Sequence, residues 1–230
     1  MGEAVRRPPR RAVHIVDDDA HMRRAIWFML ESAGYAPRVF ADGEDLLAEL
    51  DYLPLAPLLC DMSMPGMDGF EVLAEVKRRA PAVPVIMMTG HGDVPFAVRA
   101  MKGGVIDFIE KPFRNDVLLE AVEAAAAMLA ETVEQDQMMI DAVRRMADLT
   151  ARERDVLDGL AAGKSNKVIA FDLGLSIRTI EMHRVRMMRR LGARTLPEAL
   201  RLAHLASGVV SPPRAGSLAC VRARRPARAA

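Results

Sequence analysis

The sequence predicts two domains of different class: an α/β domain with a doubly wound, five-stranded parallel sheet, and an all-α domain of four helices. Before residue 127, short apolar segments alternate five times with helical patterns, which is typical of parallel sheets with right-handed crossovers. After residue 148, short amphipathic helices are separated by glycine, and no strand pattern occurs. With 51% hydrophobic residues among 230, the chain can build both cores.

Each predicted strand of the first domain is short and leads into a helix. Gly34 follows the first helix as a C-terminal stop, and Asp42 can cap the second. Residues 120–146 contain no Gly or Pro, so the fifth helix should continue into a helical linker, frayed near residues 132–136. We expect strands at 12–16, 38–40, 55–60, 83–88 and 105–109, and helices at about 21–33, 42–50, 69–80, 94–102 and from 115 onward.

Charge and composition divide the chain further. Residues 13–127 hold 10 Lys/Arg against 19 Asp/Glu, whereas residues 148–208 hold 11 against 7. An acidic domain followed by a basic one suggests a control module joined to a nucleic-acid-binding module. We expect a disordered basic arm at 1–11, the α/β domain at 12–127, a helical linker at 128–147, the helical domain at 148–208 and a disordered basic tail at 209–230.

The cellular location is also suggested by composition. No run of 18 apolar residues occurs, so we expect no membrane span. The cysteines are Cys60, in a predicted buried strand, and Cys220, in the tail. These positions argue against a disulfide and favour a reducing, cytoplasmic location.

Polar residues with phosphoryl-transfer chemistry follow four of the predicted strands. Asp17 and Asp18 come after the first strand, Asp61 after the third, Thr89 after the fourth and Lys111 after the fifth. The carboxyl ends of parallel strands meet at one edge, where open α/β sheets bind ligands. Three clustered carboxylates require a divalent cation, and oxygen ligands favour Mg²⁺ over Zn²⁺. An Asp pair alone usually caps a helix, but the ordered set favours Asp61 as a phosphoacceptor.

The helical domain has the pattern of a helix-turn-helix. Thr150 and Glu153 form a capping box, Gly174 separates two short helices, and Ser176 caps the second of them. An arginine-rich helix alone is often a solvated face. Combined with the glycine turn and the acidic partner domain, it favours DNA binding. The second helix carries Arg178, Thr179, Glu181, Met182, His183, Arg184, Arg186, Arg189 and Arg190.

Four segments of the α/β domain closely resemble the receiver domain of two-component response regulators, a flavodoxin-like fold. The resemblance covers about residues 12–127, and its last two segments are similar to the FixJ type. The segments are 13–19 (VHIVDDD), 61–69 (DMSMPGMDG), 89–93 (TGHGD) and 107–113 (DFIEKPF).

The resemblance implies a role for each residue of the acidic edge. A sensor histidine kinase would donate phosphoryl to Asp61. Mg²⁺ would be held by Asp18, Asp61 and the backbone carbonyl of Ser63, with Asp17 supporting it through water. Thr89 and Lys111 would contact the phosphate. Phe108 matches the family's aromatic switch position; because Phe lacks a hydroxyl, only a packing switch is open to it. The Lys111–Pro112 bond resembles one that is usually cis.

The helical domain resembles the LuxR-type (GerE) effector over about residues 147–207. The segments that carry this are 149–153 (LTARE), 160–170 (LAAGKSNKVIA), 175–183 (LSIRTIEMH) and 188–191 (MRRL). The resemblance implies that Asn166 and Lys167 contact backbone phosphates. The expected groove contacts are Arg178, Thr179, Met182 and Arg186, with Arg184 and Arg190 as further candidates.

These features together predict a phosphorylation-dependent transcription regulator rather than an enzyme. Phosphorylation of Asp61 would draw Thr89 inward, let Phe108 repack and promote dimerisation, placing two recognition helices about one DNA turn apart. Without phosphorylation, the receiver would mask the effector. The expected partners are a sensor histidine kinase, double-stranded promoter DNA, RNA polymerase and a second copy of the chain.

Two alternatives remain open. One is a constitutive DNA binder that uses a pseudo-receiver for dimerisation, against which the complete set of acidic-edge residues argues. The other is a phosphatase that forms an aspartyl-phosphate on Asp61. Such enzymes need a second acid two residues later as general acid, and this chain has Ser63 there.

Overall fold

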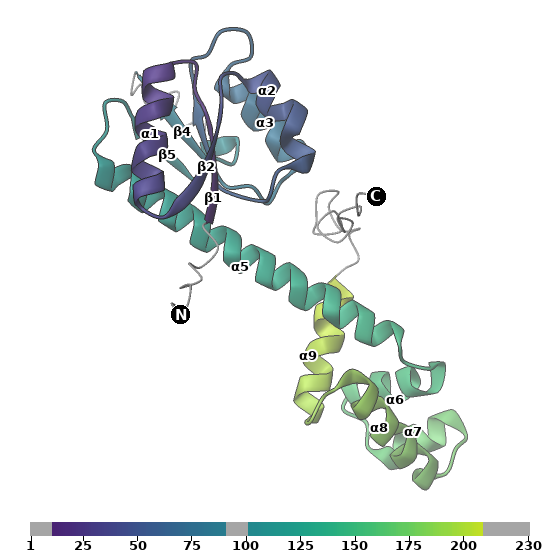
Figure 1. Ribbon diagram of the computed structural model, residues 1–230. Coiled ribbons are helices and arrows are strands. Elements are labelled where there is room, and N and C mark those ends of the chain that lie inside the picture. Colours follow the sequence, from purple (N-terminus) through teal and green to yellow (C-terminus); the bar gives the residue numbers. More distant parts are fainter. Residues whose placement is uncertain (1–10, 91–100, 209–230) are drawn as a thin grey trace, which may run out of the picture. The chain divides into compact units, whose positions relative to one another are not determined.

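A five-stranded parallel sheet forms the centre of the N-terminal unit (Figure 1). The computed structural model describes residues 11–90 and 101–208. The strand order is β2-β1-β3-β4-β5, as expected for a doubly wound fold. The strands are β1 (Arg11–Val16), β2 (Tyr35–Phe40), β3 (Leu58–Asp61), β4 (Val85–Thr89) and β5 (Asp107–Glu110). The predicted fold class is thus confirmed for this unit.

Helices lie on both faces of this sheet. Figure 1 shows α1 on one side of the strands and α2 and α3 on the other. The helix predicted at 94–102 falls almost wholly outside the described residues. The helices of this unit are α1 (Ala20–Ser32), α2 (Gly43–Glu49), the short 3₁₀ turn η1 (Leu50–Tyr52), α3 (Gly69–Arg79) and the first part of α5 (Asn115–Ala147).

Alternating strand residues divide the apolar interior into two cores, because successive side chains of a strand point to opposite faces. One core packs between the sheet, α2 and α3, and the other between the sheet, α1 and α5. Each fully buried aliphatic side chain contributes about 1.5–3 kcal/mol of transfer free energy. The first core includes Val16, Leu58, Cys60 and Met87, and the second Ile15, Leu59, Ile86 and Met88.

The observed strands differ from the prediction at their ends. β2 begins at Tyr35, three residues before the predicted start, and includes Pro37. Proline cannot donate to a strand ladder, but β2 lies at the edge of the sheet, where this loss is tolerated. β3 and β4 extend through Asp61 and Thr89, so these two residues are the last of their strands.

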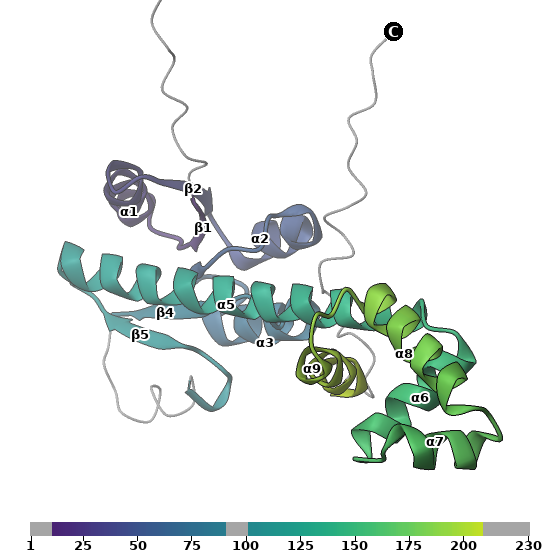
Figure 2. The same cartoon turned by 90° about the horizontal axis from the view of Figure 1, so that it is seen from below.

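The C-terminal unit is a helical bundle that begins at Glu134, inside α5. All four predicted helices are present, and Figure 2 shows α6, α7 and α8 grouped together. Their shared core includes the buried Val156, Leu157, Ile180, Met187 and Leu191. The helices are α6 (Ala151–Ala161), α7 (Asn166–Leu173), α8 (Ile177–Leu191) and α9 (Leu196–Ser207).

The helix α5 connects the two units without interruption over 33 residues. The expected fraying near residues 132–136 is therefore wrong. Thr132 keeps its place in this helix and donates its hydroxyl to the Met128 carbonyl one turn earlier, at 2.9 Å. No helix among the described residues is both long and apolar enough to cross a membrane.

Candidate phosphoryl-acceptor site and nucleic-acid interface

Three carboxylates meet at the carboxyl edge of the sheet. Asp17 and Asp18 follow β1, and Asp61 ends β3; one carboxylate oxygen of each lies within 4.8 Å of the others. Asp17 and Asp61 are buried, whereas Asp18 is exposed at the mouth. Buried carboxylates without a counter-charge are costly. A set of oxygen donors with one exposed member fits a hard divalent cation that keeps some of its water.

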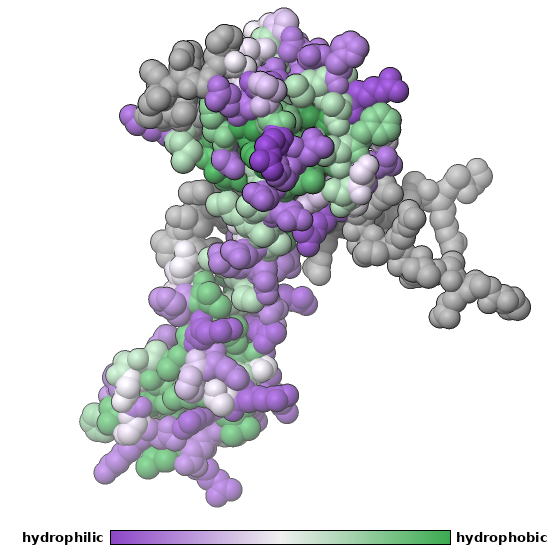
Figure 3. Space-filling model, turned by 90° about the vertical axis from the view of Figure 1, so that its left-hand side faces the viewer, coloured by the Kyte–Doolittle hydropathy of each residue, from purple (hydrophilic) through white to green (hydrophobic). Residues whose placement is uncertain are grey.

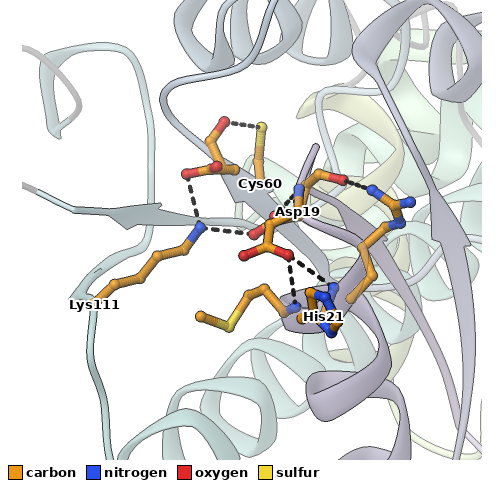
Figure 4. A network of polar contacts seen from close by, with 8 residues as sticks. Asp19, His21, Cys60 and Lys111 are labelled. Carbon is orange, nitrogen blue, oxygen red and sulfur yellow. Dashed lines mark hydrogen bonds and ion pairs between the residues drawn. The ribbon is translucent and has the colours of Figure 1, made fainter.

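Lys111 supplies the positive charge of this cluster. Its Nζ lies 2.7 Å from Asp17 Oδ2 and 3.1 Å from Asp61 Oδ1 (Figure 4). Burial disfavours the ammonium, but the hydrogen bonds and charges of Asp17 and Asp61 outweigh it and raise the pKa of Lys111. The lysine therefore stays charged at neutral pH. Its hydrogen bond with Asp17 joins two residues that are 94 positions apart in the sequence.

The remaining predicted residues of the site lie in neighbouring strands or just after them. Thr89 is fully buried at the end of β4, and its carbonyl accepts from the Lys111 N–H at 2.6 Å. The backbone N–H of Ser63 donates to the Asp61 carboxylate. Phe108 is half-buried in β5, opposite Met87 of β4. The Lys111–Pro112 peptide bond is cis, as the resemblance implied.

Gly69 sets the shape of the loop after Asp61, a role not anticipated from the sequence. Its N–H donates to the Met62 carbonyl at 3.0 Å. A Cβ at position 69 would lie 2.4 Å from the Asp61 carbonyl oxygen and 2.8 Å from Met62 Cα, which no real contact allows. Asp68 and Glu71 form a capping box directly beside it, so α3 starts against the acceptor strand.

A helix cap at Asp19 holds the start of α1 beside the site. Asp19 Oδ1 accepts from the backbone N–H of His21 at 2.8 Å, and its own N–H donates to Asp17 Oδ1 at 2.9 Å. Figure 4 shows Asp19 and His21 beside the cluster. The cap therefore fixes one oxygen of Asp17 and leaves the other to Lys111.

The protonation of Asp61 leads to a stability prediction. Burial raises the pKa of its carboxyl, and Lys111 only partly offsets this. The folded wild type then binds this proton more readily than the unfolded chain does, so ionising Asp61 lowers stability as pH rises. In metal-free buffer, we expect Asp61→Asn to be more stable than wild type at neutral pH, with the difference shrinking toward pH ~4. Urea unfolding at several pH values measures this.

Adding Mg²⁺ is the control for that experiment. A cation bound by the folded site stabilises wild type by mass action, and it should stabilise Asp61→Asn much less. A stability difference that is independent of both pH and Mg²⁺ would contradict the role assigned to the carboxylate cluster.

The second candidate site is the helix-turn-helix formed by α7 and α8. Gly174 ends α7 with φ 67°, a left-handed conformation that favours glycine. Ser176 Oγ then accepts from the Thr179 N–H at 3.1 Å and caps α8. These two residues fix the turn, so the predicted arrangement of two short helices is present.

One face of α8, here called the recognition face, is exposed and lines a shallow concavity. Of the predicted groove contacts, Arg178, Met182 and Arg186 lie on it. Thr179 is half-buried, and its hydroxyl lies 2.8 Å from Ser176 Oγ. The recognition face comprises Arg178, Glu181, Met182, Val185, Arg186 and Arg189. Glu181, Val185 and Arg189 were not among the predicted groove contacts, although their helical spacing from Arg178 and Met182 places them there.

Arg184 and Arg190 lie elsewhere. Arg184 is half-buried. Arg190 donates to the Asp148 carbonyl at 2.9 Å, and its Nε lies 3.4 Å from the buried Glu153 carboxylate. Glu153 is also the capping partner of Thr150, at 2.9 Å from its N–H. Arg190 thus connects α8 to the start of α6, which favours a structural role over a DNA contact.

Asn166 and Lys167 form the first turn of α7. Asn166 is half-buried, and Lys167 is exposed. Backbone N–H groups at a helix start attract anions, and an exposed lysine beside them can reach a phosphate. The expected phosphate contacts therefore fit this position.

The comparisons with known proteins agree with both sites. The model of the response regulator receiver domain matches residues 13–123, and that of the bacterial regulatory proteins of the luxR family matches residues 147–203. The transcriptional regulatory protein FixJ of Bradyrhizobium diazoefficiens is 42% identical over 191 residues, which covers 83% of this chain and 93% of FixJ. The chain belongs to the FixJ-like response regulators.

Other relatives place this response regulator in the same family. The C4-dicarboxylate transport transcriptional regulatory protein DctR of Rhodobacter capsulatus is 40% identical over 83% of this chain and 98% of DctR. The solved response regulator StyR is 33% identical with a TM-score of 0.77, over 85% of this chain and 98% of StyR. Full-length FixJ from B. japonicum is 41% identical with a TM-score of 0.54, over 87% of this chain and 98% of that FixJ chain. The regulator therefore combines a receiver with a LuxR-type DNA-binding domain, which implies a kinase and DNA as partners.

Proposed function

We propose that this regulator is switched by phosphorylation of Asp61, which a sensor histidine kinase carries out and which leads to dimerisation and promoter binding. The observation that carries the proposal is the cluster of Asp17, Asp18, Asp61 and Lys111 at one sheet edge. It combines a nucleophilic carboxylate, a pair of metal ligands and a fixed positive charge.

The receiver residues would divide the phosphoryl transfer among them. An Asp61 oxygen attacks phosphorus while the bond to the donor breaks, so Asp61 becomes an acyl phosphate. Lys111, already 3.1 Å from Asp61, is placed to move onto a phosphoryl oxygen. Asp18 and Asp61, the Ser63 carbonyl and, through water, Asp17 would hold Mg²⁺. When bound, Mg²⁺ supplies charge neutralisation for the phosphoryl oxygens.

The switch would pass from Asp61 through β4 and β5. A backbone hydrogen bond joins Thr89 and Lys111. A phosphoryl group that contacts both residues would therefore act on β4 and β5 at the same time. Phe108 lies in β5 beside β4 and can repack without a hydrogen bond. A two-state repacking of this face would then favour a symmetric receiver dimer.

The output would be binding of the recognition face to double-stranded promoter DNA. The bound regulator would then either assist RNA polymerase at that promoter or block it. Arg178 and Arg186 can donate to guanine edges or phosphates, and Val185 can contact a thymine methyl group. Lys167 and Asn166 would fix the register on the backbone. A dimer presents two such faces to a two-fold-symmetric site.

The phosphatase and pseudo-receiver alternatives are tested by one experiment. The full-length chain is incubated with ³²P-labelled acetyl phosphate, with and without Mg²⁺, beside Asp61→Asn. We expect Mg²⁺-dependent labelling of wild type that persists after acetyl phosphate is removed, and none of Asp61→Asn. Rapid, repeated turnover would indicate a phosphatase, and no labelling of wild type would indicate a pseudo-receiver.

A further inference from the structure

The second half of α5 carries a row of residues spaced alternately three and four apart. Ile140 and Val143 are its largest members and are 44% and 38% exposed. Figure 3 shows that apolar side chains reach the surface between hydrophilic ones. This row, here called the linker stripe, consists of Val133, Asp136, Ile140, Val143 and Ala147.

The helical unit holds α5 from the opposite side. Ala142 is fully buried, and Arg145 Nη1 donates to the Leu191 carbonyl at 2.9 Å. An α-helix turns about 100° per residue, so Ala142 and Arg145 lie roughly opposite Ile140 and Val143. The stripe therefore points away from the bundle that its own helix joins.

Spacing of three and four residues is the heptad pattern of a coiled coil. The first core position of the heptad is occupied by Val133, Ile140 and Ala147. The second is occupied by Asp136 and Val143. β-Branched residues at the first position favour two strands in parallel. We propose that the linker stripe pairs with that of a second copy of this chain, as a short, parallel, two-stranded coiled coil in the phosphorylated dimer.

The size of the stripe indicates which partner it fits. Two heptads bury far less than the roughly 1,200 Å² of a stable interface. The stripe therefore needs a partner that is already held close by another contact, and the receiver dimer of the proposed function, on which this inference rests, supplies one. The flanking positions agree with this pairing. A parallel pair would place Thr132 of one copy beside Gln137 of the other, and Met139 beside Arg144. Neither contact brings two like charges together.

The pairing would also fix the two recognition helices. Arg145 bonds the last carbonyl of α8, and Arg190 of α8 bonds the carbonyl of Asp148 just beyond α5. These bonds connect the end of the linker to the end of the recognition helix. Bringing two linkers together therefore limits how the two recognition faces can be oriented on DNA.

Cysteine cross-linking tests the proposal in the full chain. Cys220 is replaced by Ser, whereas Cys60 is kept because it is fully buried. Ile140→Cys and Val143→Cys are compared with Met138→Cys, which is similarly exposed at 46% but lies opposite the stripe. Each is oxidised mildly with Mg²⁺, with and without beryllofluoride, a phosphoryl mimic. We expect the two stripe variants to form disulfide-linked dimers at least roughly tenfold faster than Met138→Cys, and only with beryllofluoride.

Ultracentrifugation of the same samples separates the possible failures. If the dimer forms but all three cysteines cross-link equally, or none does, the coiled coil is overturned while phosphorylation-dependent dimerisation stands. If beryllofluoride produces no dimer, both proposals fail.

Asp136 provides an independent measurement. In a parallel pair its carboxylate would face that of the second copy, which weakens association. Asp136→Leu should therefore tighten the beryllofluoride-dependent dimer by roughly tenfold. Glu134→Leu, an equally acidic position off the stripe, is the matched control. Equal effects of the two substitutions would contradict the proposed register.

Discussion

Replacing Arg186 by alanine is expected to weaken binding to specific DNA by roughly fivefold to 150-fold, as loss of one good base contact does. Arg186 lies on the recognition face with Arg178 and Met182, and all three point out from α8. The DNA is first selected from a random pool with the beryllofluoride-treated wild type. Fluorescence anisotropy then gives the dissociation constants of both proteins for it.

Two further variants are the controls for this prediction. Lys167→Ala should weaken binding to all sequences alike and lower the salt dependence by about one counterion. Arg190→Ala should destabilise the helical unit, because it leaves the buried Glu153 without its cation. If Arg190→Ala loses specific affinity while Arg186→Ala does not, the assignment of the recognition face is wrong.

Replacing Asp61 by asparagine is expected to abolish the response of DNA binding to beryllofluoride. In wild type, dimerisation makes binding of the second half-site intramolecular, which should raise affinity by about 100-fold or more. Asparagine removes the carboxylate oxygen that would bind the phosphoryl mimic. Of the two acids that contact Lys111, only Asp17 then remains. Anisotropy with and without beryllofluoride and Mg²⁺ measures the ratio of affinities.

Asp68→Asn is the matched control, because it changes another acid of the same loop. Asp68 caps α3 by accepting from the Glu71 N–H at 2.8 Å, and asparagine caps helices equally well. This variant should respond like wild type. A lost response in both variants would show that the loop, rather than the Asp61 carboxylate, had been disturbed.

The parts of the fold that depend on local pattern were predictable. The alternation of apolar runs with helical patterns predicted the parallel sheet. The caps at Asp42, Thr150 and Ser176 predicted helix starts that the structure confirms. The order of acids, Thr89 and Lys111 along the chain was enough to predict the acidic edge, since parallel strands bring their carboxyl ends together.

The features missed depend on contacts between distant segments. The longer β2 tolerates Pro37 only because it is an edge strand, which local sequence does not indicate. Gly69 is needed because a Cβ at this position would lie 2.4 Å from the Asp61 carbonyl oxygen. Arg190 is similar to its arginine neighbours in sequence, but the buried Glu153 and the Asp148 carbonyl separate it from them.

The central claim is that phosphorylation of Asp61 controls assembly. Analytical ultracentrifugation of the full-length wild type and Asp61→Asn, each in Mg²⁺ with and without beryllofluoride, tests it most directly. The account predicts that wild type alone changes from monomer to dimer, and only when beryllofluoride is present. Dimers of both proteins under all conditions, or monomers throughout, would contradict it.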